Sequence, residues 1–217
     1  MTHDHDADHD HDHDHDAHAP IEANDDAGYF DRLETAMREL LIGKGIVDAD
    51  EIRRAIETFD ARSPAIGAKV VARAWVDPQF RARLFDDAIA ACEEMGVTMF
   101  DGTKLIALEN TERVHNVVVC TLCSCYPRPL LGLPPDWYKS KAYRSRVVRW
   151  PREVLAEFGT SIPADIDIRV HDSTASMRYL VVPARPPGTE HMTEEQLAEL
   201  VTRDTMIGVA LPQSAPA

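Results

Sequence analysis

Three of the four cysteines of this chain lie within six residues, at Cys120, Cys123 and Cys125. A disulfide between cysteines so close in sequence would depart from the preferred Cα separation, and three thiols would leave one unpaired. A tetrahedral zinc site would need a fourth ligand from a second Cys/His pair, and none lies nearby at the usual spacing. The spacing therefore indicates a small claw, residues 120–125, that binds a transition metal with catalytic chemistry.

The Cys-x-x-Cys-x-Cys spacing turns the chain so tightly that the backbone amides of Ser124 and Cys125 should lie beside the sulfurs. Three sulfurs and two deprotonated amide nitrogens would form a square pyramid of ligands with one position open. Such strong-field donors favour a low-spin trivalent ion, iron or cobalt, over zinc. An open position on a trivalent ion is a Lewis acid that polarises a bound substrate or lowers the pKa of a bound water. The thiolates also lie on the oxidation ladder to sulfenic and sulfinic acid.

The claw follows an apolar run that reads as the end of a strand. Four prolines just beyond it predict a rigid, non-helical path, and Thr193 with Gln196 predicts a capping box for a helix that reaches about Arg203. The expected strands are Leu105–Leu108, Asn116–Val119, Ile166–Val170, Tyr179–Val182 and Met206–Leu211, and further helices are expected at Tyr143–Arg149 and Pro151–Phe158.

The preceding segment reads as a series of helices. Apolar residues at helical spacing predict a helix over Tyr29–Leu41, and Asp48 with Glu51 predicts a capped second helix. Ser63 and Asp77, each followed by proline, should begin a third and a fourth helix, the latter running to about Met95. These short helices carry much apolar surface, so we expect an arm that packs on a partner subunit. The remaining cysteine, Cys92, should be a buried, inert thiol.

The expected fold class is α+β, with a helical arm at 27–96, a mixed α/β core at 97–212 that places the claw at a strand end, and a flexible end at 213–217. The chain has 217 residues and a net charge of −14. No apolar run is long enough for a membrane span. No basic-then-apolar signal precedes the arm, so a reducing cytoplasm is the expected compartment.

Residues 1–26 form a low-complexity acidic tail that we expect to be disordered. They account for ten of the fourteen net negative charges and contain no Lys or Arg, which leaves only −4 for the rest of the chain. Nothing in that remainder suggests a nucleic-acid surface. Histidine alternates with aspartate through most of residues 3–18, a pattern that binds divalent cobalt, nickel, copper or zinc. The tail is therefore either a metal-capturing segment that supplies the claw or a solvated acidic tail.

Four stretches together resemble a known family: Val-Cys-Thr-Leu-Cys-Ser-Cys at 119–125, Leu-Gly-Leu-Pro-Pro-Asp-Trp-Tyr-Lys-Ser at 131–140, Tyr-Arg-Ser-Arg-Val-Val-Arg at 143–149 and Arg-Asp-Thr-Met-Ile-Gly-Val at 203–209. They resemble the nitrile hydratase α subunit and the related thiocyanate hydrolase γ subunit. The resemblance covers nearly all of residues 28–211.

This resemblance implies a metal bound by the three cysteine sulfurs and the amides of Ser124 and Cys125, with Cys123 as the sulfinic and Cys125 as the sulfenic acid. Thr121 matches the cobalt version, whereas the iron version usually carries serine, so Co³⁺ is expected and Fe³⁺ is the alternative. The implied reaction adds water to a nitrile to give an amide. The metal would polarise the nitrile nitrogen, while the sulfenate of Cys125 attacks the carbon or activates a water.

The resemblance also implies partners. Arginines of a β-type subunit, possibly split into two chains, would hydrogen-bond the oxidised sulfurs, and an activator protein would deliver the metal. A thiocyanate hydrolase γ-like subunit that forms carbonyl sulfide and ammonia is the alternative function. A non-catalytic metal-binding protein and a redox sensor based on low-pKa thiols are weaker alternatives, since neither accounts for both the claw and the long resemblance.

Departures from the nitrile hydratase pattern leave the substrate open. Arg128 and Trp150 stand where those subunits have tryptophan and glutamate, and both resemble the thiocyanate hydrolase γ subunit. Arg128 would place a cation near the site, either for an anionic substrate or for a salt bridge to a partner. Asp101 stands where glutamine is common. Tyr126 and Trp137 are expected either to line a substrate pocket or to pack in the core or an interface. His115 and His171 are expected to be structural histidines.

Overall fold

The computed structural model describes residues 27–99 and 102–214. The predicted tail, residue Asp101 and the last three residues of the predicted flexible end lie outside these ranges. The helices are α1 (Ala27–Gly43), α2 (Ala49–Asp60), α3 (Pro64–Val76), α4 (Pro78–Asp86), α5 (Ala88–Glu94), α6 (Arg128–Leu131), α7 (Asp136–Lys139), α8 (Lys141–Arg146), α9 (Pro151–Glu157), α10 (Glu194–Glu199) and α11 (Arg203–Ile207). The strands are β1 (Lys104–Glu109), β2 (Val114–Val119), β3 (Asp167–Asp172) and β4 (Met177–Val182).

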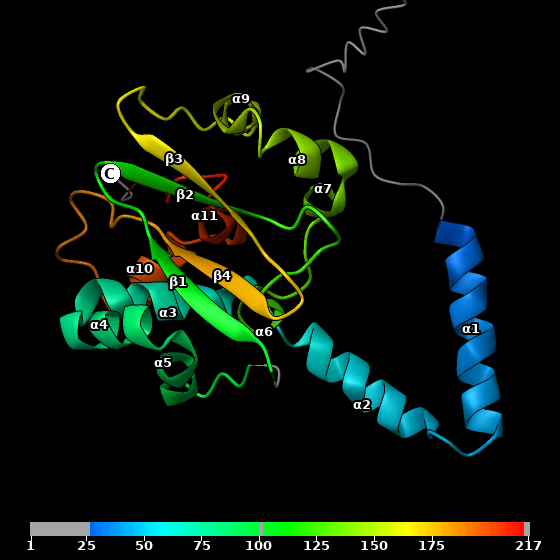
Figure 1. The fold of residues 1–217 in the computed structure, drawn as a ribbon. Helices are drawn as coiled ribbons and strands as arrows, with labels where there is room; N and C mark the ends of the chain where they lie inside the picture. Colours follow the sequence, from blue (N-terminus) through cyan, green and yellow to red (C-terminus); the bar gives the residue numbers. More distant parts are fainter. Residues whose placement is uncertain (1–26, 100–101, 215–217) are drawn as a thin grey trace, which may run out of the picture.

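The strands form two parallel pairs, β1 with β4 and β2 with β3. Helices α3, α4 and α5 lie along the β1 and β4 side, whereas α7, α8 and α9 lie at the opposite end, near β3 (Figure 1). Buried side chains of α3 and α4, such as Val71 and Leu84, belong to one hydrophobic cluster. Val117 and Val118 of β2 and Leu180 of β4 belong to the same cluster. The predicted combination of helices and strands is therefore confirmed, with the cysteines directly after β2.

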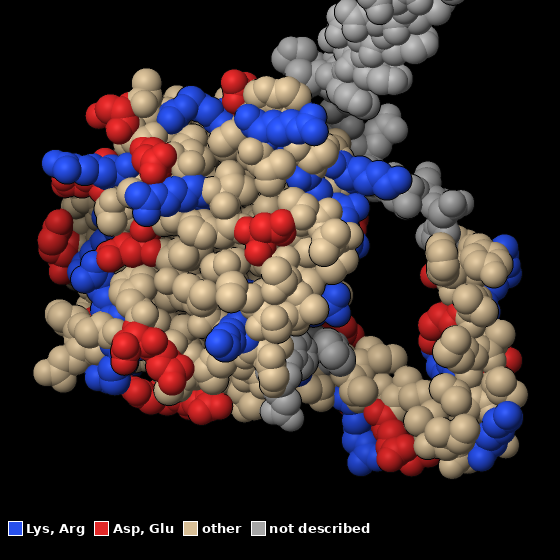
Figure 2. Space-filling model, viewed as in Figure 1, with Lys and Arg blue, Asp and Glu red and all other residues tan. Residues whose placement is uncertain are grey.

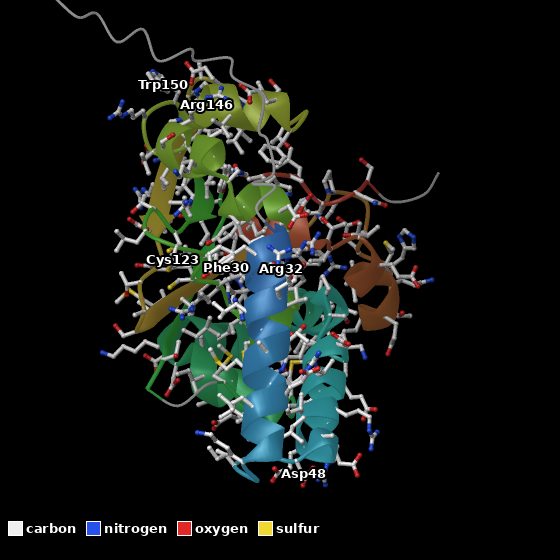
Figure 3. All side chains as sticks on the ribbon, turned by 90° about the vertical axis from the view of Figure 1, so that its right-hand side faces the viewer. Phe30, Arg32, Asp48, Cys123, Arg146 and Trp150 are labelled. Carbon is white, nitrogen blue, oxygen red and sulfur yellow. The ribbon has the colours of Figure 1, made fainter. Side chains whose placement is uncertain are left out.

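An arm of two helices, α1 and α2, projects from this core (Figure 1). Asp48 and Glu51 form the predicted reciprocal cap of α2, with N–H to carboxylate distances of 2.9 and 2.7 Å. Figure 3 shows Phe30 near the first turn of α1 and Asp48 at the far end of the arm. Large apolar side chains of α1 remain exposed, Phe30 to 65%. The domain division at residue 96 stays a prediction, but α3 to α5 share the buried core with the strands, so only α1 and α2 project.

Two helix predictions were wrong because local caps divide the helices. The fourth predicted helix stops at Asp87, whose backbone is extended and whose carboxylate accepts hydrogen bonds from the N–H groups of Ile89 and Ala90. This cap begins α5 instead of continuing α4. The helix begun at Thr193 has its predicted capping box but ends at Glu199. Ser63 precedes α3 without a capping hydrogen bond from its side chain.

Two further predictions failed at turns. The prolines after the claw do not exclude helices: α6 and α7 are single turns, and Pro129 lies in the first turn of α6, where a missing N–H is harmless. The predicted last strand, Met206–Leu211, is instead the end of α11, which Thr202 caps and Gly208 terminates at φ +92°. Among the described helices, none is long and apolar enough to span a membrane.

Candidate metal centre

The claw begins where β2 leaves the core. Cys120 is buried, Cys125 is half-buried and Cys123 is exposed, so the loop rises from the interior to the surface. Between them Leu122 is 88% exposed. Figure 3 shows Cys123 at one edge of the core, to the side of α1. The three sulfurs nevertheless converge, as the spacing predicts: Sγ of Cys123 lies 3.4 Å from that of Cys120 and 3.3 Å from that of Cys125.

The donor set fits a single metal ion. None of the three cysteines is in a disulfide. Their Sγ atoms all lie within 4.8 Å of one another. A typical metal–thiolate distance is about 2.3 Å, so two sulfurs on one ion are separated by at most about 4.6 Å. Both measured Sγ–Sγ distances are well below that limit, and three convergent soft thiolates favour a transition metal over calcium or magnesium.

Backbone amides also contact the cysteine sulfurs. The backbone N–H of Cys123 donates to Sγ of Cys120 at 3.3 Å. The pKa of the Cys123 thiol is lowered, first by its contacts with Cys125 and Cys120, and also by the backbone N–H groups of Ser124 and Cys125. The pKa of Cys125 is raised to about 12, first by burial and then by the contact with Cys123, while Arg178 acts in the opposite direction. A coordinating metal ion would hold the three sulfurs together as thiolates.

The loop is held from three sides. The backbone N–H and Oγ1 of Thr121 donate to the carboxylate of Asp172, at the end of β3, over 2.9 and 2.6 Å. The Tyr138 hydroxyl donates to the Cys125 carbonyl at 2.9 Å, and the Tyr143 hydroxyl donates to the Val118 carbonyl at 2.8 Å. Asp172 was missed by the sequence analysis. It lies two residues beyond the predicted strand Ile166–Val170, and only the parallel register that pairs Val119 with Asp172 identifies its target.

Two arginines flank the mouth of the claw. A cavity of about 250 Å³ is lined by Cys123, Ser124, Cys125, Tyr126, Arg128 and Arg178. The predicted contact residues Arg128 and Tyr126 are therefore placed at the site. Arg178 was missed, because it follows the claw by more than fifty residues and reaches it only through the position of β4. Tyr126 is 3% exposed, and its hydroxyl has no hydrogen-bond partner among the described residues.

Trp137 lies elsewhere. Its ring packs edge-on against Tyr143 and Phe158, with centroids 4.9 and 4.7 Å apart. Of the two readings given for this residue, core packing is the one that the structure shows. The aromatic group supports the tyrosines that hold the claw rather than lining its cavity.

Both core histidines are structural, as predicted. Asn110 Oδ1 accepts from the Asn116 backbone N–H at 2.8 Å, which leaves the Asn110 amide nitrogen facing Nδ1 of His115 at 3.2 Å. Nδ1 of His115 must therefore accept, and its Nε2–H donates to the Gly208 carbonyl at 2.7 Å. His171 contacts Oδ1 of Asn116 at 2.8 Å. This polar network joins β2 to Asn110 after β1, to His171 of β3 and to Gly208 after α11.

Comparison with known proteins gives consistent results. The nitrile hydratase alpha-chain family matches residues 28–210. The low-molecular weight cobalt-containing nitrile hydratase subunit alpha of Rhodococcus rhodochrous is 57% identical over 178 residues, which cover 82% of this chain and 86% of that one. The thiocyanate hydrolase subunit gamma of Thiobacillus thioparus is 46% identical over 205 residues, covering 89% and 84%.

Solved structures agree. A double mutant of the Fe-type nitrile hydratase from Comamonas testosteroni Ni1 is 42% identical, with a TM-score of 0.81 over 88% of this chain and 98% of that chain. The similarity thus extends well beyond the cysteine motif, through both parallel strand pairs and the helices around them. The resemblance inferred from the sequence is confirmed, and the chain belongs to the nitrile hydratase alpha-chain family.

Proposed function

We propose that this chain is the metal-binding subunit of a nitrile hydratase, and that it adds water to nitriles to give amides. The observation that carries the proposal is the convergence of Cys120, Cys123 and Cys125 within 4.8 Å, beside a cavity that two arginines flank. Relatives that are 51–57% identical are named nitrile hydratase alpha subunits, which supports this reaction over a non-catalytic metal site.

Cobalt is the proposed metal, with iron as the alternative. Two of those relatives are named as cobalt-containing, and Thr121 matches the cobalt pattern. A trivalent cobalt ion, when bound, supplies a Lewis acid that polarises the carbon–nitrogen triple bond. Cys120, Cys123 and Cys125 with the amides of Ser124 and Cys125 would hold it. The structure tests only the convergence of these donors.

The remaining chemistry belongs to the chain itself. We propose that an external oxidant such as dioxygen converts Cys125 to sulfenic acid and Cys123 to sulfinic acid, and that the Cys125 oxygen attacks the nitrile carbon or activates a water there. The hydrogen bond from Tyr138 to the Cys125 carbonyl would fix this residue against the cavity. Arg128 and Arg178 line the same cavity and would stabilise the negative charge that develops on oxygen.

A partner subunit is required by this proposal. Cys123 and Leu122 are exposed, whereas addition of water to a nitrile benefits from a closed, water-poor site. The exposed apolar side chains of α1 supply a surface for a β-type subunit, either one chain or two. Delivery of the metal by an activator protein and a cytoplasmic location complete the proposal.

The test is co-expression of the chain with the products of its neighbouring genes. Purified complex should convert small nitriles to amides and should contain cobalt. Cys125→Ser should abolish turnover, whereas Cys92→Ser, which changes a buried thiol away from the claw, should retain it. Full activity of the Cys125→Ser complex would contradict the mechanism, and iron as the only metal would contradict the cobalt assignment.

Thiocyanate hydrolysis is the second candidate, because two guanidinium groups at the cavity suit an anionic substrate. The same complex should then release carbonyl sulfide and ammonia from thiocyanate. Replacing Arg128→Trp would shift the preference toward nitriles. Activity on thiocyanate alone in the unmodified complex would overturn the nitrile assignment.

A further inference from the structure

A second basic surface lies beside the claw, and neither Arg128 nor Arg178 lines it. The groove is about 520 Å³ in volume and is lined by Thr121, Lys141, Ala142, Arg144, Ser145, Val148 and Arg149. We call it the basic groove. Three of its residues are cationic and none is acidic. The guanidinium of Arg144 approaches the carbonyl of Thr121 at 3.4 Å, so the groove borders the claw directly.

These cations have no carboxylate partner. Within residues 27–99 and 102–214, Lys141, Arg144 and Arg149 form no ion pair. Arg144 donates to the backbone carbonyls of Ser140 and Thr121, each at 3.4 Å, and the guanidinium of Arg149 lies over the ring of Trp150. Arg146 of the same region, in contrast, is neutralised by Glu157. A groove with three unpaired cations and no carboxylate is an electrostatic site for an anionic segment.

The sequence of the same chain contains such a segment. Residues 1–26 carry ten acidic groups and no Lys or Arg, and seven histidines lie among residues 3–18. The first turn of α1, which this tail precedes, lies at the end of the arm nearer α7 and α8 (Figure 1). In Figure 2, several Lys and Arg side chains lie along the edge of the core that faces the first turn of α1.

Residues 19–26 connect the docking segment to α1. An extended chain spans roughly 3.3 Å per residue, so these eight residues reach as far as roughly 26 Å, and residues nearer the N-terminus reach farther. Because the tail is covalently attached, its local concentration at the groove is on the order of millimolar, far above that of a dilute external anion. The segment that favours this groove most is therefore the tail of the same chain.

We propose that residues 3–18 dock in the basic groove and there present captured divalent metal to the claw. Imidazole and carboxylate groups in alternation suit borderline ions such as Co²⁺. Each captured ion neutralises two of the ten acidic charges, so a tail with one ion stays anionic and docked. Thr121 belongs both to the groove and to the claw, which places the docked histidines beside the cysteines. The docking is independent of the proposed function, whereas the metal transfer rests on it.

Docking is tested on the full chain by carbodiimide coupling of carboxylates to lysines, followed by tryptic mass spectrometry. The tail forms one peptide, residues 1–32, because Arg32 is its first cleavage site. We expect Lys141 to be the main acceptor among the five lysines, and 0.5 M NaCl to lower its coupling by about fivefold. Coupling spread evenly over the five lysines would overturn the docking. So would coupling that occurs mainly between different molecules, as seen when isotopically labelled and unlabelled chains are mixed.

Variants distinguish the electrostatic attraction of the basic groove from the presence of Lys141, the lysine that accepts the coupling. Arg144→Ser with Arg149→Ser keeps Lys141 but removes two cations, and coupling should fall about fivefold. Arg149→Ser alone, at an exposed position, covers the case in which the double variant fails to fold. Arg53→Ser with Arg54→Ser removes the same charge from exposed positions on α2 and should leave coupling unchanged. Equal coupling in both double variants would refute the proposal.

Metal presentation is tested with limiting Co²⁺, by following the thiolate-to-cobalt absorption band and not the total cobalt, which the tail itself would bind. The full chain and the Arg53→Ser/Arg54→Ser variant should develop the band several times faster than Arg149→Ser or a chain that lacks residues 1–20. Equal rates in the full and shortened chains would overturn the presentation. Because the readout is not turnover, this outcome is distinguishable from failure of the nitrile hydratase assignment.

Discussion

Replacing Gly208→Ala should destabilise the chain more than replacement of any glycine that merely ends a helix. Gly208 adopts φ +92°, and a Cβ atom there would lie 2.0 Å from the carbonyl oxygen of Asn116 and 3.1 Å from Cα of Val117. Both of these are backbone atoms of β2, the strand that leads into the claw. No side-chain rotation relieves the overlap, so β2 itself must move.

The magnitude follows from two contributions. A left-handed conformation at a residue other than glycine costs about 1–2 kcal/mol. Forced overlap in a packed interior costs about 1–3 kcal/mol more, and displacement of backbone belongs at the upper end. Gly208→Ala should therefore lose about 3–5 kcal/mol, a large share of the roughly 5–15 kcal/mol that stabilises a domain.

Gly159→Ala is the matched control. Gly159 also follows a helix with positive φ, +78°, but nothing lies within 4 Å of an added Cβ atom there. The Gly159→Ala variant should lose only the conformational contribution to its free energy of unfolding, about 1–2 kcal/mol. Urea unfolding of the purified chains, followed by circular dichroism, gives both values. If the two variants are equally stable, the close approach of Gly208 to β2 does not constrain the fold as described.

Three other perturbations test the anchor of the claw and two buried groups of the core. Asp172→Asn should weaken retention of cobalt against a chelator by roughly 10–100-fold, whereas Asp165→Asn, which changes an exposed carboxylate before β3, should not. Burial lowers the pKa of His115 below its usual 6.5, so the folded chain binds fewer protons than the unfolded chain. The contribution of His115 to stability should therefore be complete above pH 6.5 and should be lost as the pH falls. In urea titrations, His115→Gln should reduce this loss of stability at low pH. Cys92 is fully buried and its pKa is raised to about 12, so iodoacetamide should leave it unmodified in the native chain and modify it in urea.

Local signals predicted the local parts of this structure well. The reciprocal cap at Asp48 and the capping box at Thr193 depend on residues three apart, and both are present. The convergence of the cysteines is likewise local, since the sulfurs are at most five residues apart in sequence. Helix ends were predicted poorly where a second cap, as at Asp87, competes with continuation of an apolar pattern.

The surroundings of the claw were not predictable from local patterns. Asp172 and Arg178 approach the cysteines only because β3 pairs in parallel with β2 and β4 lies beside it. Parallel pairing leaves no turn signal in the sequence, because its strands are joined by long connections. The spacing identified the cysteines, and a departure from the nitrile hydratase pattern identified Arg128, whereas Asp172 and Arg178 required the assembled fold.

The parallel pairing also has a consequence for biosynthesis. Neither strand pair can form locally: β2 precedes β3 by about fifty residues, and β1 precedes β4 by about seventy. Contacts of such long range form slowly. During translation the cysteines therefore leave the ribosome well before the strand whose Asp172 anchors their loop. In that interval three thiols lie on an unanchored segment, open to oxidation or to the wrong ion, and correct metal loading depends on timing as much as on affinity.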